Sequence, residues 1–137
     1  HGFMDTSYFL YSEDTDYCFR LGQAGVQIIE VPRSLIIHED VGSHKTGQVS
    51  VLKPIIQYYR SRNRIVFFRR YFGDVRGFVE VVRQLFWTCA WVAVTPLKGS
   101  MALEVARYMM LGIIDGMRNR MGKRFAPEAS LNTKEHA

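Results

Sequence analysis

Residues 53–118 have helical character, and only two short segments interrupt it. Segments 73–77 and 96–100 carry the glycine and proline that end helices. The pattern therefore predicts helices at 53–72, 78–94 and 101–118. The second of these contains an uncharged run of eleven residues, 85–95, which is too short to cross a bilayer because that takes roughly 20 residues.

The first fifty residues have a different pattern, with short apolar runs on either side of one amphipathic stretch. Runs 7–11, 26–31 and 35–37 are rich in aromatic and β-branched residues, which predicts short strands. Between the first two, helical spacing predicts a helix at 13–24, with Ser12 as its N-cap and Gly25 as its C-terminal glycine.

The charge is distributed unevenly along the sequence. Residues 1–52 have a net charge of −4, residues 53–125 have +10, and residues 126–137 have −1. The polar last segment is predicted to be disordered. Cys18 and Cys89 lie far apart, which argues against a disulfide framework and fits a reducing compartment. The imbalance suggests that the two main segments have different tasks.

Three acids, Glu13, Asp14 and Asp16, stand at the start of the predicted helix. Residues two positions apart on a helix point in different directions, so one carboxylate can face a cleft while another braces the turn. Acids in a first turn also stabilise a helix through its dipole without any chemical role. The acidic cluster alone leaves both interpretations open. Asp16 and Arg20 are spaced to form an ion pair along the helix.

Residues 2–43 closely resemble the second half of the catalytic domain of family 2 glycosyltransferases, best the rhamnosyl- and galactofuranosyl-transferase-like branch. The resemblance rests on ordered matches over some forty positions, with Thr6 in place of the commoner Glu. The matching residues are Gly2, Asp5, Phe9, Tyr11, Glu13, Asp14, Asp16, Arg20, Ala24, Gly25, Val31, Pro32 and His38. The ending at 112–125 also looks like the closing helix of this branch.

The resemblance implies an inverting enzyme with an α/β, Rossmann-like, nucleotide-diphospho-sugar transferase (GT-A) domain, of which this chain carries the C-terminal part. It assigns Asp14 as the catalytic base that takes the proton from the acceptor hydroxyl, an effect of about 10²–10⁴-fold on rate. Glu13 is expected beside it, orienting the acceptor or bracing the turn. The nucleotide-binding half is expected upstream, so the chain by itself is predicted to be inactive.

His38 follows an apolar run, where a histidine commonly serves only as a structural hydrogen-bonding group. The resemblance instead implies that His38 helps to bind a divalent cation, Mg²⁺ or Mn²⁺, that holds the donor diphosphate. Carboxylates are the usual ligands of these ions, and they are expected from an upstream Asp-x-Asp motif. The loop with Ser43 and His44 resembles a segment that closes over the donor; its alternative is a plain solvated loop.

The first basic helix resembles the Tyr-Tyr-x-x-Arg-Asn signature of many of these enzymes, through Tyr58, Tyr59, Arg62 and Asn63. Arg60 or Arg62 is predicted to meet a donor phosphate or an anionic lipid carrier, because a guanidinium binds phosphate in a bidentate manner. The alternative is an amphipathic helix with a solvated basic face. Nucleic-acid binding is not expected, because no known nucleic-acid module is recognisable.

The last two predicted helices combine tryptophans and apolar residues with a cationic rim, a composition that suits the surface of a bilayer. The alternative is a helical hairpin packed on protein or in a homo-oligomer contact. We therefore expect catalytic-domain residues at 1–50, a basic membrane-proximal helical region at 51–125 and a disordered tail at 126–137.

The predicted function is sugar transfer from a nucleotide-sugar donor to a cell-envelope glycan or lipid-linked acceptor. The expected location is cytoplasmic, peripheral to the inner or plasma membrane. The alternative is a non-catalytic membrane-surface or interaction module, or an inactive transferase remnant.

Overall fold

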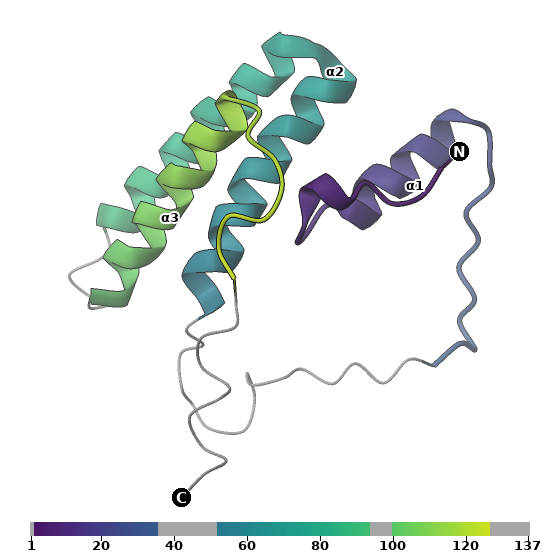
Figure 1. Ribbon diagram of the computed structural model, residues 1–137, viewed down its shortest axis with the longest axis horizontal. Helices are drawn as coiled ribbons and strands as arrows, with labels where there is room; N and C mark the ends of the chain where they lie inside the picture. The colour runs from purple at the N-terminus through teal and green to yellow at the C-terminus, as the bar shows by residue number, and fades with distance from the viewer. Residues whose placement is uncertain (1, 36–51, 94–99, 127–137) are drawn as a thin grey trace, which may run out of the picture.

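The computed structural model describes residues 2–35, 52–93 and 100–126. These residues form one short 3₁₀ helix and three α-helices. Their bounds are Thr6–Tyr8 for η1, Glu13–Gln23 for α1, Leu52–Ala93 for α2 and Ser100–Met117 for α3. Figure 1 shows α2 bent back on itself with α3 alongside, while α1 lies to the other side of the first half of α2.

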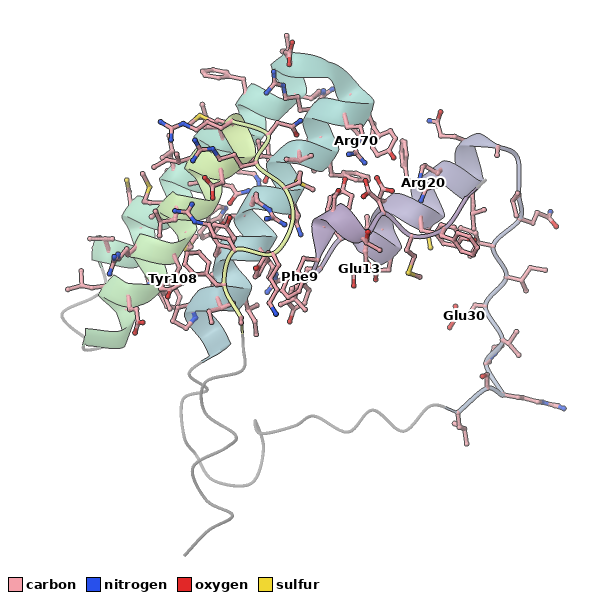
Figure 2. The ribbon with its side chains drawn as sticks, viewed as in Figure 1. Phe9, Glu13, Arg20, Glu30, Arg70 and Tyr108 are labelled. Carbon is pink, nitrogen blue, oxygen red and sulfur yellow. The ribbon has the colours of Figure 1, made fainter. Side chains whose placement is uncertain are left out.

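The predicted α/β fold is wrong for the described part of the chain, which contains helices and no strand. Residues 7–11 form the end of η1 and a turn, and residues 26–31 run without regular structure. Of the third predicted strand only Leu35 lies within the described residues. A strand is stable only when a neighbouring strand takes up its backbone hydrogen bonds, and the described residues supply none. The apolar segment 26–35 is therefore exposed, as Figure 2 shows around Glu30.

The predicted helical region is confirmed, and its first break is a single residue. Gly73 interrupts α2 with φ 84° and ψ 171°, a conformation that glycine adopts without steric cost. The two halves of α2 then run back along one another. Gln84 Nε2 donates to the carbonyl oxygen of Ser61 at 3.1 Å, and Arg64 Nε pairs with Glu80 Oε1 at 2.6 Å. The predicted second break falls between α2 and α3.

α3 packs closely against the α2 hairpin because two of its residues are glycines. A Cβ on Gly112 would overlap the carbonyl oxygen of Tyr58, and one on Gly116 would lie 3.0 Å from that of Arg62. The buried core between these helices is small and consists of Ile65, Val81 and Ile113, with Leu85 packed against it. Hydrogen bonds of buried polar side chains therefore hold much of this structure together, and they also position the site.

α1 packs on the first half of α2 through an aromatic cluster. The ring of Phe19 lies 5.4 Å from Phe67, 4.6 Å from Tyr71 and 5.4 Å from Phe72, measured between centroids. The helix ends at Gln23, one residue before the predicted end, and Gly25 follows the C-cap with a φ of 75°, the role predicted for it. These contacts place the N-terminus of α1 beside the basic residues of α2.

Candidate functional site

The chain enters α1 through a strained turn. Phe9, Tyr11 and Ser12 have positive φ angles of 64°, 64° and 70°, which side-chain-bearing residues seldom adopt. Ser12 stands at the predicted N-cap position, but its side chain makes no capping hydrogen bond. Strain of this kind costs about 1–3 kcal/mol per residue and persists only where surrounding contacts impose it. Contacts from other parts of the chain therefore impose these backbone angles on the turn.

Asn63 and Arg62 of α2 stabilise this turn through hydrogen bonds to its backbone carbonyl oxygens. Asn63 Nδ2 donates to the carbonyl oxygens of Leu10 at 2.8 Å and Tyr11 at 2.7 Å, and more weakly to that of Tyr8 at 3.2 Å. Arg62 Nη2 donates to the same Tyr8 oxygen at 2.8 Å. Both side chains are completely buried. Because the donors sit on a helix, they set the path of the turn and the direction in which α1 begins.

The two tyrosines before them hold the segment after α3. Tyr58 donates its hydroxyl to Asp115 Oδ2 at 2.7 Å. Tyr59 donates to the carbonyl oxygen of Phe125 at 2.8 Å and accepts from the backbone amide of Arg124 at 2.9 Å. With Arg62 and Asn63, these tyrosines form a set of four that we call the clamp. The clamp joins the strained turn, α2 and the end of the described chain.

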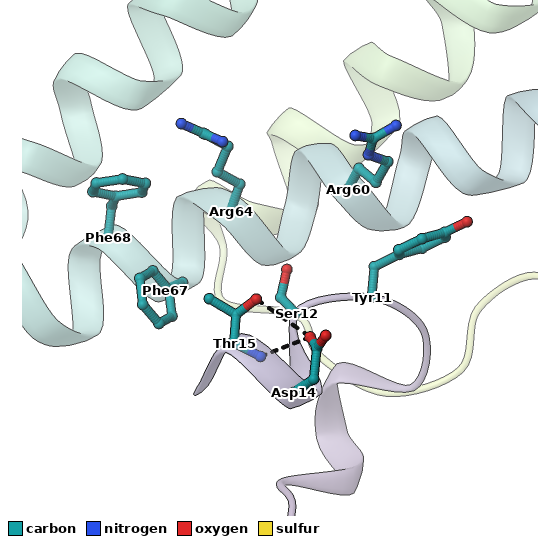
Figure 3. Close-up of a pocket in the computed structure, with 8 residues that line it drawn as sticks. All are labelled: Tyr11, Ser12, Asp14, Thr15, Arg60, Arg64, Phe67 and Phe68. Carbon is teal, nitrogen blue, oxygen red and sulfur yellow. Dashed lines mark hydrogen bonds between the residues drawn. The ribbon is translucent and has the colours of Figure 1, made fainter. Parts of the chain in front are cut away.

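A pocket of about 420 Å³ opens beside the strained turn (Figure 3), which we call the Asp14 pocket. Side chains from the turn and the start of α1 form one wall, and the first half of α2 forms the other. The lining residues are Tyr11, Ser12, Asp14, Thr15, Arg60, Arg64, Phe67 and Phe68. Its volume lies in the range of sites for small ligands, and its lining combines aromatic and charged groups.

Asp14 is exposed, and its hydrogen bonds from described residues both end on one oxygen. Oδ1 accepts from the backbone amide of Thr15 at 2.6 Å and from its hydroxyl at 3.3 Å (Figure 3). These bonds fix the direction of the carboxylate. Within the described part of the chain Oδ2 has no such partner, so it is open to a ligand hydroxyl.

Two arginines face Asp14 across the pocket, and their surroundings differ. Arg64 is paired with the buried carboxylate of Glu80, and its guanidinium lies 5.3 Å from the ring centre of Phe68. Arg60 lies 5.8 Å from the ring centre of Tyr11 and forms no ion pair with the described residues. Arg60 therefore offers its positive charge to an anionic ligand at lower cost than Arg64 does.

Asp16 lies on the opposite side of α1 and is completely buried. It accepts hydrogen bonds from the hydroxyls of Tyr71 at 2.7 Å and Tyr8 at 3.2 Å, and from Arg70 Nη1 at 3.2 Å. The predicted pair with Arg20 is present, Nε to Oδ2 at 2.9 Å. We call these residues the Asp16 cluster; Figure 2 shows Arg20 and Arg70 on facing sides of α1 and α2. Burial raises the pKa of the Tyr8 phenol well above its usual value.

Other predicted site residues have different surroundings from Asp14. Glu13 does not line the pocket, and its Oε2 is buried without a partner among the described residues. Arg62 is completely buried with its donors on protein acceptors, which makes it a packing residue, whereas Arg60 lines the pocket. His38, Ser43 and His44 lie outside the described residues.

Several pocket residues were missed by sequence reasoning. Arg64, Phe67 and Phe68 lie one and two turns after Arg60, within a helix whose sequence indicates only a basic, aromatic character. Their spacings of four, seven and eight residues from Arg60 place these three residues on the same face of the helix as Arg60. This spacing was the signal in the sequence that could have found them. Thr15, which donates two hydrogen bonds to Asp14, was also missed.

Comparisons with protein-family models, with curated proteins and with solved structures returned no match for this chain. Within the helices that the structure describes, none combines the length and apolar character needed to span a membrane. The described residues also bring together no group of three histidine, cysteine, aspartate or glutamate side chains. The geometry of the Asp14 pocket is therefore the basis for a functional assignment.

Proposed function

We propose that this chain supplies the acceptor-activating side of an inverting glycosyltransferase. The enzyme would transfer a sugar from a nucleotide-diphosphate donor to a cell-envelope glycan or lipid-linked acceptor at the cytoplasmic face of a membrane. The observation that carries the proposal is the exposed Asp14 carboxylate, which shares a pocket with Arg60 and with aromatic side chains. The strained turn next to Asp14 supports it, because such strain gathers at functional sites.

Inverting sugar transfer requires one correctly oriented general base. An acceptor hydroxyl attacks the anomeric carbon in line, the bond from that carbon to the donor diphosphate breaks, and the nucleoside diphosphate leaves with the bonding electrons. Asp14 Oδ2 takes the hydroxyl proton as the new glycosidic bond forms, while Oδ1 stays bonded to Thr15. Proton transfer to a positioned base contributes about 10²–10⁴-fold.

Arg60 has the chemistry to hold an anionic part of a substrate during this step. A guanidinium binds a phosphate through two parallel hydrogen bonds, and Arg60 has no carboxylate partner among the described residues. The aromatic rings of Tyr11 and Phe68 border the same space and offer flat apolar surfaces. The pocket thus combines a base, an anion-binding group and apolar walls.

The resemblance that suggested this function also implies a divalent cation, Mg²⁺ or Mn²⁺, on the donor diphosphate. The described residues gather no group of three suitable ligands. His38 lies outside them. We therefore derive no step through a metal, and the proposed role of Asp14 does not depend on one.

The test replaces Asp14 by asparagine in the complete gene product. Asp14→Asn keeps the shape of the side chain and removes its basicity, so transfer from nucleotide-diphosphate sugars should fall by about 10²–10⁴-fold. Glu30→Gln is the matched control: it removes one exposed carboxylate far from the pocket and should leave turnover unchanged. The measurement is the initial rate of labelled-sugar transfer at saturating donor.

Unchanged turnover in Asp14→Asn rules out the base assignment. A complete gene product that transfers no sugar favours the alternative, a non-catalytic module. In that case Asp14→Asn should alter only the binding of a ligand to the pocket, measured by calorimetry.

A further inference from the structure

The second half of α2 contributes Val81 and Leu85 to the core, and it also has polar residues on its inward side and apolar residues on its outward side. Its side facing the first half of α2 and α3 carries the buried polar residues Glu80, Gln84 and Thr88. Its outward side carries apolar residues that are 50% to 77% exposed: Val75, Phe78, Val79, Val82 and Phe86. Surface helices normally turn their apolar side inward, so this arrangement needs an external apolar environment.

These five residues form one continuous surface, which we call the apolar stripe. They recur at intervals of three and four positions, which places them on one face of the helix. Cys89, also exposed, continues the spacing one turn further on. From Val75 to Phe86 the helix rises by about 17 Å. That length suits a helix lying in the plane of a bilayer surface and is too short to cross it.

The charges around the stripe determine which partner fits it. Arg76 and Arg83 border one edge, and Arg83 is paired with Glu80, the single acid between positions 75 and 93, whose carboxylate is buried. Trp87 is half exposed next to Arg83, and tryptophan favours the boundary between lipid and water. Residues 53–125 as a whole have a net charge of +10. An anionic lipid surface complements an apolar stripe with a cationic edge.

A second copy of the chain fits this stripe less well. In an antiparallel two-fold contact, equivalent edges of two helices lie side by side, so the arginines of one copy would face those of the other. Arg83 is paired with Glu80 in each copy, but Arg76 has no carboxylate partner among the described residues, and like charges brought together oppose association.

We infer that the apolar stripe on the second half of α2 docks onto an anionic membrane surface, with Phe78 and Phe86 inserted among the lipids. Arg76, which has no carboxylate partner among the described residues, then contacts the headgroup phosphates, while Arg83 stays paired with Glu80 at the edge of the stripe. This inference does not depend on the proposed enzymatic function, because it uses neither Asp14 nor its pocket. It specifies the face of the molecule that meets the membrane.

The first experiment measures co-sedimentation of the 137-residue chain with vesicles. Phosphatidylcholine vesicles are compared with vesicles of equal parts phosphatidylcholine and phosphatidylglycerol. The chain should bind the anionic vesicles, and binding should weaken at ~1 M salt, where the screening length is about 3 Å. The double variant Phe78→Asp/Phe86→Asp should lower the partition coefficient by more than about tenfold, because two exposed aromatic rings no longer enter the lipid.

The control variant is Phe3→Asp/Ile29→Asp, which changes two exposed apolar residues away from α2 and alters the net charge equally. It should bind like the parent chain. Equal binding by the two double variants, or no binding of the parent chain to anionic vesicles, overturns the inference. Circular dichroism of each variant checks that the helices are retained.

The two exposed cysteines provide a second readout with an internal control. An environment-sensitive fluorophore on Cys89, in a Cys18→Ser background, should shift to the blue when anionic vesicles are added. The same fluorophore on Cys18, in a Cys89→Ser background, should not shift. If the Cys89 label shifts with rising protein concentration and without vesicles, the stripe is an interface between copies and the inference is wrong.

Discussion

Asp14 and Asp16 are two positions apart on α1 and have opposite surroundings. Asp14 is exposed in a pocket and receives bonds only from its neighbour Thr15 among the described residues. Asp16 is completely buried and receives bonds from two tyrosines and two arginines. The difference follows from the helix, which turns by about 200° over two residues. An aspartate on one side of α1 is therefore available to a ligand, whereas an aspartate on the other side stabilises the fold.

This contrast teaches which residue of an acidic cluster to regard as functional. A carboxylate whose lone pairs are all used by protein donors has no capacity left for a substrate, whereas one with a free oxygen in a pocket does. The same distinction separates the arginines of α2. Arg62 uses its donors on carbonyl oxygens of Tyr8 and Gly122, while Arg60 lies in the pocket.

The strongest test of this comparison measures the stability of the two aspartate variants. Asp16→Ala should lower the free energy of unfolding by about 1–3 kcal/mol, because it leaves the buried hydroxyl of Tyr8 without its acceptor, while the partly exposed Arg20 and Arg70 can be hydrated. Asp14→Ala should lower it by less than about 1 kcal/mol, the worth of an exposed acid at a helix N-terminus. Urea denaturation followed by circular dichroism gives both values. Similar losses in the two variants contradict the division of roles.

A second test asks whether the clamp holds the pocket wall in place. Asn63→Ala removes the donor to the carbonyl oxygens of Leu10 and Tyr11, and should cost about 1–3 kcal/mol for the buried acceptors left unpaired. Amide hydrogen exchange around Ser12 should accelerate more than exchange in α3, because the strained turn is freed first. Arg60→Ala on the same helix is the control and should change stability by less than about 0.5 kcal/mol. Uniform acceleration across all helices argues against a local role.

A third test concerns the close packing of α3 against α2. The helix α1, which carries both aspartates, packs on α2. Gly112→Ala places a methyl group against the carbonyl of Tyr58 and 2.9 Å from Cβ of Ser61, so α3 must move away from α2. Such overpacking should cost about 1–3 kcal/mol. Gly22→Ala in α1 meets no atom within 4 Å and should instead stabilise the chain by up to about 1 kcal/mol. Thermal midpoints of the two variants should therefore shift in opposite directions.

The smallest expected effect concerns alkaline pH. Burial raises the pKa of Tyr8 and Tyr71, the phenols bonded to Asp16, above the ordinary value of 10.0. A raised folded-state pKa adds stability that is fully present below the unfolded pKa and is lost as pH rises through the folded one. Unfolding free energy should thus fall above ~pH 10. Tyr71→Phe should reduce this fall, and an unchanged pH profile in that variant contradicts the assignment of Tyr71 to the Asp16 cluster.

The sequence predicted the helices well and the strands badly, and the reason is the range of their hydrogen bonds. Each helix bonds within itself, so spacing, Gly25 and the break at Gly73 could be read locally. The strand expected at 26–31 depends on a partner, and residues of that run are exposed without one in the described structure. An apolar, β-branched composition indicates that a segment favours burial. It does not determine whether a sheet or another contact buries the segment.

By itself the sequence determined the helices of α1–α3, the Asp16–Arg20 pair at helical spacing, and the excess of positive charge after residue 52. Only the tertiary structure decided that Arg62 and Asn63 are buried clamp residues, that Arg60 and Arg64 share a pocket with Asp14, and that Glu80, Gln84 and Thr88 of α2 are buried. Helical spacing depends on neighbours three or four residues away, whereas burial depends on contacts between residues 50 or more positions apart, such as Asn63 with Leu10. Those contacts exist only once the chain has folded.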